Sequence, residues 1–228
     1  MANLFRAMAA ATVVGVVAYF LQPHFFPGAP SPDFKTLQPA DAPDLVDTLD
    51  RYTWALRDDK VAYRNHCLRV LSFAEHFMRE AGQSEASIER RRPLAAVALA
   101  YHDIALWSDN KLNYLTPSAA RAARDLSEFQ PGDVQLVRDI IEAHHKWTPF
   151  VGSSDDVLVN AIRLGDWVDF TQNLGLPLRS GMPAGNIAKA NAALPKLNFI
   201  GILAGLPAKI MPSSPLKGNL EVMKIFKW

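Results

Sequence analysis

The residues of this 228-residue chain that are best suited to chemistry are His102 and Asp103, which follow the apolar run 93–101. An imidazole and a carboxylate are costly to bury at the end of an apolar helix unless a shared partner neutralises them. In proteins a divalent metal ion is the usual partner of such a pair. Three further residues elsewhere in the chain have side chains that could complete a metal site: His66, His144 and Asp166.

The spacing around His66 predicts that this side chain points into the core. His66, Val70, Phe73 and Phe77 follow one another in steps of four, three and four residues, which places them on one stripe of a helix. A single histidine on such a stripe is more often a core residue than a metal ligand. The prediction of a metal site therefore depends on the other residues of the set.

Two other helical series end in a residue of the set. Apolar residues in steps of three, four and three residues lead to His144, so His144 is predicted to point inward and His145 to lie about 100° away around the helix. A series in steps of four leads to Asp166, and Asp169 lies one turn further on and could substitute for it. A group of buried carboxylates and imidazoles is best explained by a shared cation.

The elements that must position these residues are predicted to be helices. Gly82, Pro117 and the pair Pro131-Gly132 stand where helices are expected to stop or start. No alternating strand pattern of useful length occurs, so the predicted fold class is all-α. The predicted helices cover residues 44–57, 61–81, 87 or 93 to 106, 116–129, 133–147 and 155–172.

Four segments are predicted along the chain. Residues 1–26 form an apolar anchor or signal segment, and residues 27–43 contain five prolines and form a linker. Residues 44–172 form the metal-binding helical domain. Residues 173–228 form a less regular C-terminal extension that packs on the domain, with one helix expected over 186–199.

The N-terminal segment has an uninterrupted apolar core at 7–21, with Arg6 before it. This core is shorter than the roughly 20 residues that a membrane-spanning helix needs, but residues 4–26 together approach that length. Three interpretations stay open: a membrane anchor, a cleaved signal peptide, and a helix docked on the domain. The first predicts a membrane-associated protein, and the alternatives are a cytoplasmic or an exported one.

Composition narrows the classes of partner and of metal ligand. The 24 Lys and Arg residues almost balance the 23 Asp and Glu residues, so no basic field is present to attract a nucleic-acid polymer. The only cysteine is Cys67, which excludes an intramolecular disulfide and a cysteine-based zinc site. The composition leaves the oligomeric state open.

In this order, the candidate ligands resemble the motifs of a known family. His66, the pair His102-Asp103 and Asp166, with residues 66–70 fitting the form H-x-x-R-V, resemble the HD superfamily of metal-dependent phosphohydrolases over roughly residues 60–172. The resemblance implies an HD-type helical bundle with metal ligands on these four residues. Residues 140–145, Ile-Ile-Glu-Ala-His-His, resemble an additional histidine motif of subgroups that hold a second metal or bind the substrate phosphate.

The chain also departs from patterns found in the family. Many members continue the central motif as His-Asp-Ile-Gly-Lys, whereas here Ala105, Leu106 and Trp107 follow Ile104. The lysine that contacts a phosphate in some members is therefore missing. No Gly-Tyr-Pro signature is present, which argues against the cyclic-di-GMP subgroup.

The residue types predict the chemistry of the site. Imidazoles and carboxylates together suit one or two divalent ions, with Mn, Fe, Zn, Co and Mg as the candidates. A bound ion lowers the pKa of its water from about 15.7 toward about 7, and we expect the hydroxide to attack a phosphomonoester or small nucleotide. Asp103 is the expected catalytic residue, which takes the proton of the water. The residues expected to bind the substrate phosphate are Arg69, His145 and Lys146.

Two alternatives to a phosphohydrolase stay open. The family resemblance extends to di-iron oxygenases and to hydratases of small nitriles, which use overlapping ligand sets on the same scaffold. The other alternative is a membrane-tethered domain without catalytic activity, whose metal ion is only structural.

Overall fold

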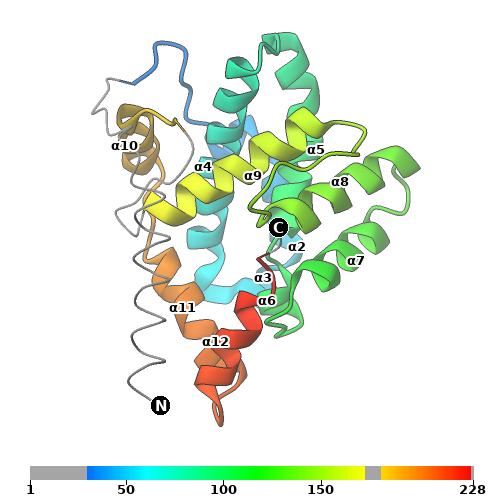
Figure 1. Ribbon diagram of the computed structural model, residues 1–228, viewed down its shortest axis with the longest axis vertical. Helices are drawn as coiled ribbons and strands as arrows, with labels where there is room; N and C mark the ends of the chain where they lie inside the picture. The colour runs from blue at the N-terminus through cyan, green and yellow to red at the C-terminus, as the bar shows by residue number, and fades with distance from the viewer. Residues whose placement is uncertain (1–29, 173–180, 227–228) are drawn as a thin grey trace.

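The computed structural model describes residues 30–172 and 181–226, and throughout these ranges the regular structure is helical, with no strand (Figure 1). The predicted all-α class is therefore confirmed. The anchor or signal segment predicted for residues 1–26 lies outside the described residues. Among the helices that are described, none is both long enough and apolar enough to cross a membrane.

Eight helices lie within residues 30–172, before the gap at residues 173–180. They are α2 (Pro43–Arg51), α3 (Thr53–Leu56), α4 (Lys60–Glu80), α5 (Glu85–Tyr101), α6 (Ala105–Ser108), α7 (Leu115–Asp125), α8 (Pro131–Ala143) and α9 (Asp156–Thr171). Three more follow it: α10 (Ala184–Ala193), α11 (Phe199–Ile210) and α12 (Pro215–Met223). Two short 3-10 turns, Pro39–Asp41 and Arg57–Asp59, flank α2 and α3.

The centre of the bundle is the packing of α9 against α4, which is buried over most of its length (Figure 1). The two helices approach closely at Gly165 of α9. A Cβ atom at Gly165 would lie only 2.7 Å from the carbonyl oxygen of Val70 in α4. Glycine is therefore required at this contact, and it brings the helix that carries Asp166 close to the helix that carries His66.

Several helix ends match the local sequence signals. Ser84 accepts a hydrogen bond from the Ser87 amide at the start of α5, and Asp155 accepts one from the Leu158 amide at the start of α9. Pro131 occupies the first turn of α8, where its missing amide hydrogen costs nothing.

Four helices end at least four residues earlier than predicted, at Arg51, Tyr101, Asp125 and Ala143, and two of these ends lie at the candidate site. The helix expected to run to residue 106 stops at Tyr101, because the next amides are bound by side chains: the Asp103 amide donates to the Tyr63 hydroxyl and the Ala105 amide to Ser118 Oγ, both at 3.1 Å. The helix expected over 133–147 stops at Ala143. Both breaks occur at the histidines of the candidate site.

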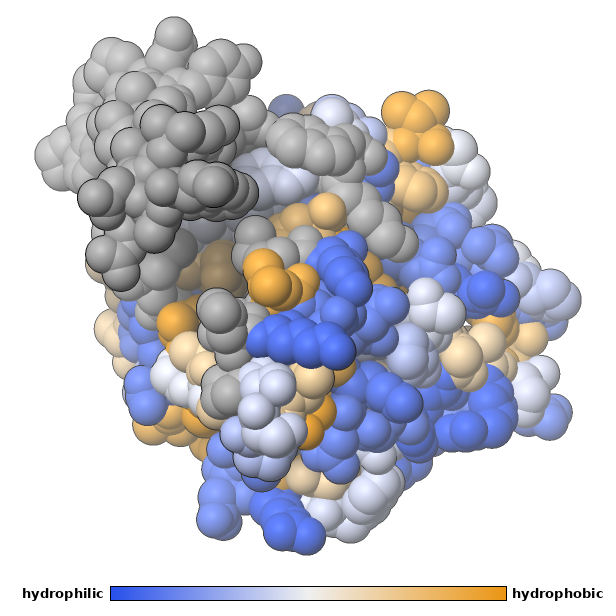
Figure 2. All heavy atoms as spheres, turned by 60° about the horizontal axis from the view of Figure 1, so that its bottom comes forward, coloured by the Kyte–Doolittle hydropathy of each residue, from blue (hydrophilic) through white to orange (hydrophobic). Residues whose placement is uncertain are grey.

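The flanking segments pack on the bundle in the parts that the structure describes. Phe34 and Leu37, within the predicted linker, are buried, and the Leu37 amide donates to Ser72 Oγ. The C-terminal extension forms three helices where one was expected over 186–199. Its α10 ends at Ala193, and Phe199 and Ile225 enter the core. Where the end with α11 and α12 is brought forward, hydrophilic side chains dominate the right of the view, and hydrophobic ones lie near the middle, along the left edge and at the upper right (Figure 2).

Candidate metal centre

Six imidazole and carboxylate side chains meet inside the bundle. Five of them are the predicted metal ligands, and the sixth is His145, which was predicted to bind substrate. Their ligand atoms form three overlapping groups, within each of which all atoms lie inside 4.8 Å of one another. The six residues, called the cluster below, are His66 in α4, His102 and Asp103 after α5, His144 and His145 after α8, and Asp166 in α9.

One half of the cluster has distances that suit a shared ion. This first half consists of His66, His102 and one oxygen each of Asp103 and Asp166. His66 Nε2 lies 3.2 Å from His102 Nε2 and 3.4 Å from Asp166 Oδ1. His102 Nε2 lies 3.3 Å from Asp103 Oδ2. Ligand atoms at about 2.1 Å from a metal ion are separated by about 3.0 to 3.4 Å at neighbouring octahedral or tetrahedral corners. These separations match that range.

The second half of the cluster uses the other oxygen of each carboxylate. Asp103 Oδ1 lies 3.4 Å from His144 Nε2, and Asp166 Oδ2 lies 3.7 Å from His145 Nδ1. Each carboxylate therefore faces a histidine of both halves. This arrangement could hold one ion or two.

Three of the histidines are oriented by the nitrogen that faces away from the cluster. His102 Nδ1 donates to the Leu99 carbonyl oxygen at 2.5 Å, and His144 Nδ1 donates to the Ile141 carbonyl oxygen at 2.7 Å. A carbonyl oxygen can only accept, so these bonds leave each Nε2 available as a ligand. Metal-binding histidines in proteins almost always make such a second bond. In the third, His66, Nδ1 lies 2.7 Å from Asp169 Oδ2.

Two buried polar atoms in the cluster make no hydrogen bond with any residue in the described part of the chain. They are Asp103 Oδ1 and His144 Nε2, which face one another at 3.4 Å. While His144 is neutral, leaving both atoms unsatisfied in the interior costs on the order of 1 to 3 kcal/mol each. Burial opposes a charge on His144, but Asp103 outweighs this effect and raises the pKa of His144. A cation between them would satisfy both, so the residues present fit a divalent metal.

The pKa values of the histidines follow from burial and from the neighbouring carboxylates. Burial lowers the pKa of His102 to about 4, and burial with the adjacent His144 lowers that of His145 to about 3. Burial acts in the same direction on His66, but Asp166 and Asp169 outweigh it and raise the pKa to about 9. At neutral pH His102 and His145 are therefore already in the neutral form that binds metal.

The carboxylates of the cluster stay ionised. Burial alone would raise the pKa of Asp103, but His102 and His144 hold it well below its usual range. Burial acts the same way on Asp166, and its hydrogen bond with His66 is the main cause that keeps this pKa low. Both side chains therefore offer negatively charged oxygens to a cation.

The three residues predicted to bind substrate have different surroundings. Arg69 is fully buried in an ion pair with Asp169. The prediction that His145 is turned away from His144 is wrong, because α8 ends at Ala143 and both rings then reach the cluster. Lys146 lies next to the cluster, and its carbonyl oxygen accepts from Arg163 and Trp167.

Several residues at the cluster were not singled out from the sequence for this role. The Tyr63 hydroxyl lies 3.1 Å from His102 Nδ1, and the Tyr114 hydroxyl lies 2.6 Å from His145 Nε2. Phe199 stacks on His66 with ring centroids 4.4 Å apart, and Phe226 lies 5.0 Å from the ring of His145. In the sequence, only the position of Tyr63, three residues before His66 and so on the same side of the helix, could have indicated a place at the cluster. The two phenylalanines come from the C-terminal extension and each contacts one histidine of the cluster.

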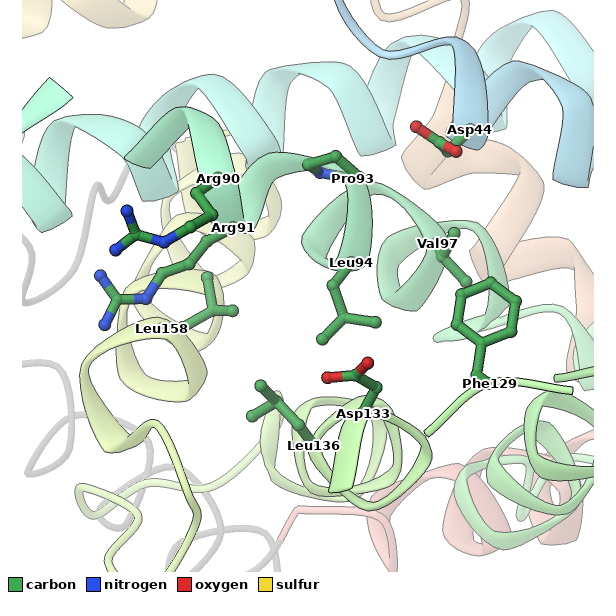
Figure 3. Close-up of a pocket in the computed structure, with 10 residues that line it drawn as sticks. All are labelled: Asp44, Arg90, Arg91, Pro93, Leu94, Val97, Phe129, Asp133, Leu136 and Leu158. Carbon is green, nitrogen blue, oxygen red and sulfur yellow. The ribbon is translucent and has the colours of Figure 1, made fainter. Parts of the chain in front are cut away.

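A pocket of about 340 Å³ lies elsewhere, between α5 and α8 (Figure 3). Leu94, Leu136 and the Asp133 carboxylate converge on it, with Arg90 and Arg91 at one side. Of the described residues that line this pocket, none belongs to the cluster. The pocket is therefore separate from the candidate metal centre.

The chain matches no known family model, no curated protein and no solved structure. A functional assignment therefore depends on the chemistry of the cluster.

Proposed function

We propose that this protein is a metal-dependent phosphohydrolase that acts on a phosphomonoester or a small nucleotide. The observation that carries the proposal is the pair of unsatisfied atoms, Asp103 Oδ1 and His144 Nε2, buried among four further ligand residues. A buried set of this composition is stable when a cation completes it.

The residues that would hold the first ion are His66, His102, Asp103 and Asp166, and His144 and His145 would complete a second position. When bound, a divalent ion lowers the pKa of a bound water toward neutrality and withdraws charge from a phosphoryl oxygen. The protein contributes the fixed orientation of the rings, which the hydrogen bonds of His102 and His144 to backbone carbonyls support.

Asp103 is the proposed general base. Its two oxygens face His102 and His144 at 3.3 and 3.4 Å, so with an ion in the first position alone Oδ2 can bind metal while Oδ1 accepts a proton from the attacking water. The low pKa of Asp103 keeps it ionised at neutral pH. A general base must lie within hydrogen-bond reach of the proton that it removes.

His145 and Lys146 are the residues proposed to meet the substrate phosphate. The side chain of His145 is the most exposed of the cluster at 12%, compared with 5% for those of Asp103 and Asp166. Substrate is therefore proposed to enter on the side of His145, where Phe226 packs against it. Arg69 has no part in this proposal because its guanidinium is bound within the protein.

A phosphoester panel assayed with the full chain and added Mn²⁺, Co²⁺, Mg²⁺, Fe²⁺ or Zn²⁺ tests the proposal. We expect metal-dependent release of phosphate that falls at least about 100-fold in Asp103→Asn, which is the usual size of a general-base contribution. Asp133→Asn, a carboxylate at the separate pocket, is the matched control and should keep the activity. Equal phosphate release in wild type and Asp103→Asn would contradict the proposed role of Asp103.

The same preparation distinguishes the other candidate chemistries. Each carboxylate faces both halves of the cluster with its two oxygens, which also suits a di-iron oxygenase. Such an enzyme would show two irons per chain and consume oxygen during turnover. A structural metal would bind without any turnover across the panel.

A further inference from the structure

The bond made by His66 Nδ1 differs from those made by His102 and His144. The other two rings donate to backbone carbonyls of their own helices, whereas His66 Nδ1 lies 2.7 Å from a side-chain carboxylate oxygen, Asp169 Oδ2. Asp169 is buried to 1% exposure and belongs to none of the three groups of ligand atoms. Its role is therefore separate from direct metal binding.

The Asp169 carboxylate is itself fixed on both oxygens. Oδ1 accepts from Arg69 Nε at 2.6 Å and from Gln172 Nε2 at 2.7 Å. Oδ2 accepts from Arg69 Nη2 at 2.8 Å as well as facing His66. Arg69 Nη1 also donates to the Leu194 carbonyl oxygen at 2.9 Å, which anchors the guanidinium. A bidentate arginine pair of this kind has a strongly defined geometry.

The positions of these residues connect the pair to the metal ligands. Arg69 lies three residues after His66 on α4, and Asp169 lies three residues after Asp166 on α9. The ion pair between the two helices is therefore one turn away from two of the proposed ligands. Asp169 contacts both Arg69 and the ring of His66, and so links the ion pair to that ring.

We propose that Asp169, held by Arg69, is a positioning residue of the metal centre. By accepting the Nδ1 proton of His66 it fixes the tautomer in which Nε2 is the atom that binds the ion, aimed at the cluster 3.2 Å from His102 Nε2; the Nε2 proton of the metal-free ring leaves when the ion binds. The carboxylate also makes the ring a stronger ligand, as carboxylate partners of metal-bound histidines do. This inference rests on the proposed function only in that the cluster binds a divalent ion.

The substitution Asp169→Asn tests the inference. The carboxylate faces nitrogen atoms of Arg69, Gln172 and His66, so the amide NH₂ of asparagine must face at least one of these groups. Where it faces His66, Nδ1 becomes the acceptor and the ring proton moves to Nε2, the atom needed for the metal. Exchange of an aspartate for asparagine beside a histidine can select the wrong tautomer in this way. We expect metal affinity to fall roughly 10- to 100-fold.

A matched control separates positioning from a merely structural ion pair. Glu75 on the same helix is buried to 2% exposure and pairs with Arg79 and Arg92. Glu75→Gln should lower the thermal stability, as Asp169→Asn does, and leave the affinity for Zn²⁺ or Mn²⁺ unchanged. Affinity is measured by competition with a chelator on the full-length chains.

The outcomes separate the inference from the proposed function. Metal binding by wild type and Asp169→Asn with equal affinity overturns the inference and leaves the metal site intact. No metal binding by wild type overturns both. If Asp169→Asn does not fold, nitrogen-15 NMR of the wild-type protein with Zn²⁺ provides the test: a proton on Nδ1 of His66 supports the inference, and its absence overturns it.

Discussion

The close contact of α4 and α9 predicts that Gly165→Ala destabilises the protein and damages the metal site. The added Cβ would lie 2.7 Å from the Val70 carbonyl oxygen and 3.2 Å from the Ala74 amide nitrogen, both backbone atoms of α4. Ordinary contacts are about 3.5 to 4.0 Å, so one helix must move. His66 and Asp166 would separate with it.

The expected cost can be worked from two opposing effects. Overpacking of a tight core contact typically costs about 1 to 3 kcal/mol, while alanine is favoured over glycine within a helix by up to about 1 kcal/mol. We therefore expect the free energy of unfolding to fall by about 1 to 2 kcal/mol. For a chain of this size each kcal/mol corresponds to roughly 2 to 4 °C in Tm. Urea unfolding of the metal-free protein measures the change.

Gly132→Ala is the matched control for this prediction. Gly132 lies in the first turn of α8, and a Cβ there would meet nothing within 4 Å. This variant should be as stable as wild type or slightly more stable, and it should keep its metal affinity. If Gly165→Ala were as stable as Gly132→Ala, the close approach of α4 and α9 would not be as described.

Three further predictions concern the cluster. Asp103→Ala removes the carboxylate shared by both halves, so metal affinity should fall at least about tenfold, as chelator competition would reveal. The carboxylates raise the pKa of His66 to about 9, so a metal ion that binds at neutral pH must displace a proton from this ring. The metal affinity should therefore rise with pH up to about 9. Calorimetry of metal binding in two buffers at pH 7 should record the release of this proton. The stability of the metal-free protein should peak near pH 6.5. Below this pH the unfolded chain takes up protons on His102 and His145, whose pKa values in the folded protein are about 4 and 3, so unfolding is favoured. Above it the stabilisation from protonated His66, whose folded pKa is about 9, is progressively lost. Urea midpoints at pH 5, 6.5 and 8.5 test this, and a midpoint that rises steadily from pH 5 to 8.5 would refute the part played by His66.

Helical periodicity was enough to predict that the side chains of His66 and Asp166 are buried. The stripe from His66 to Phe77 and the steps that lead to Asp166 both face the core in the structure, because a helix keeps its phase over several turns. The all-α class followed from the same periodicity. The periodicity describes each helix by itself and carries no information about contacts between helices.

The features that could not be predicted depend on contacts between distant residues. The break after Tyr101 rests on bonds to Tyr63 and Ser118, and no local signal marks it. His145 joins the cluster only because α8 ends at Ala143. Likewise, the burial of Arg69 depends on Asp169, a hundred residues further along the chain.

The most direct test of the central claim is the metal content of the full-length protein. Wild-type protein and Asp103→Ala are expressed with Mn, Fe, Co, Zn and Mg present, passed over a desalting column without chelator, and subjected to elemental analysis. The cluster predicts one or two divalent ions per chain in the wild type and a clear loss in the variant. Only traces of metal in the wild type, with no binding when these ions are titrated back, would contradict the proposed metal centre.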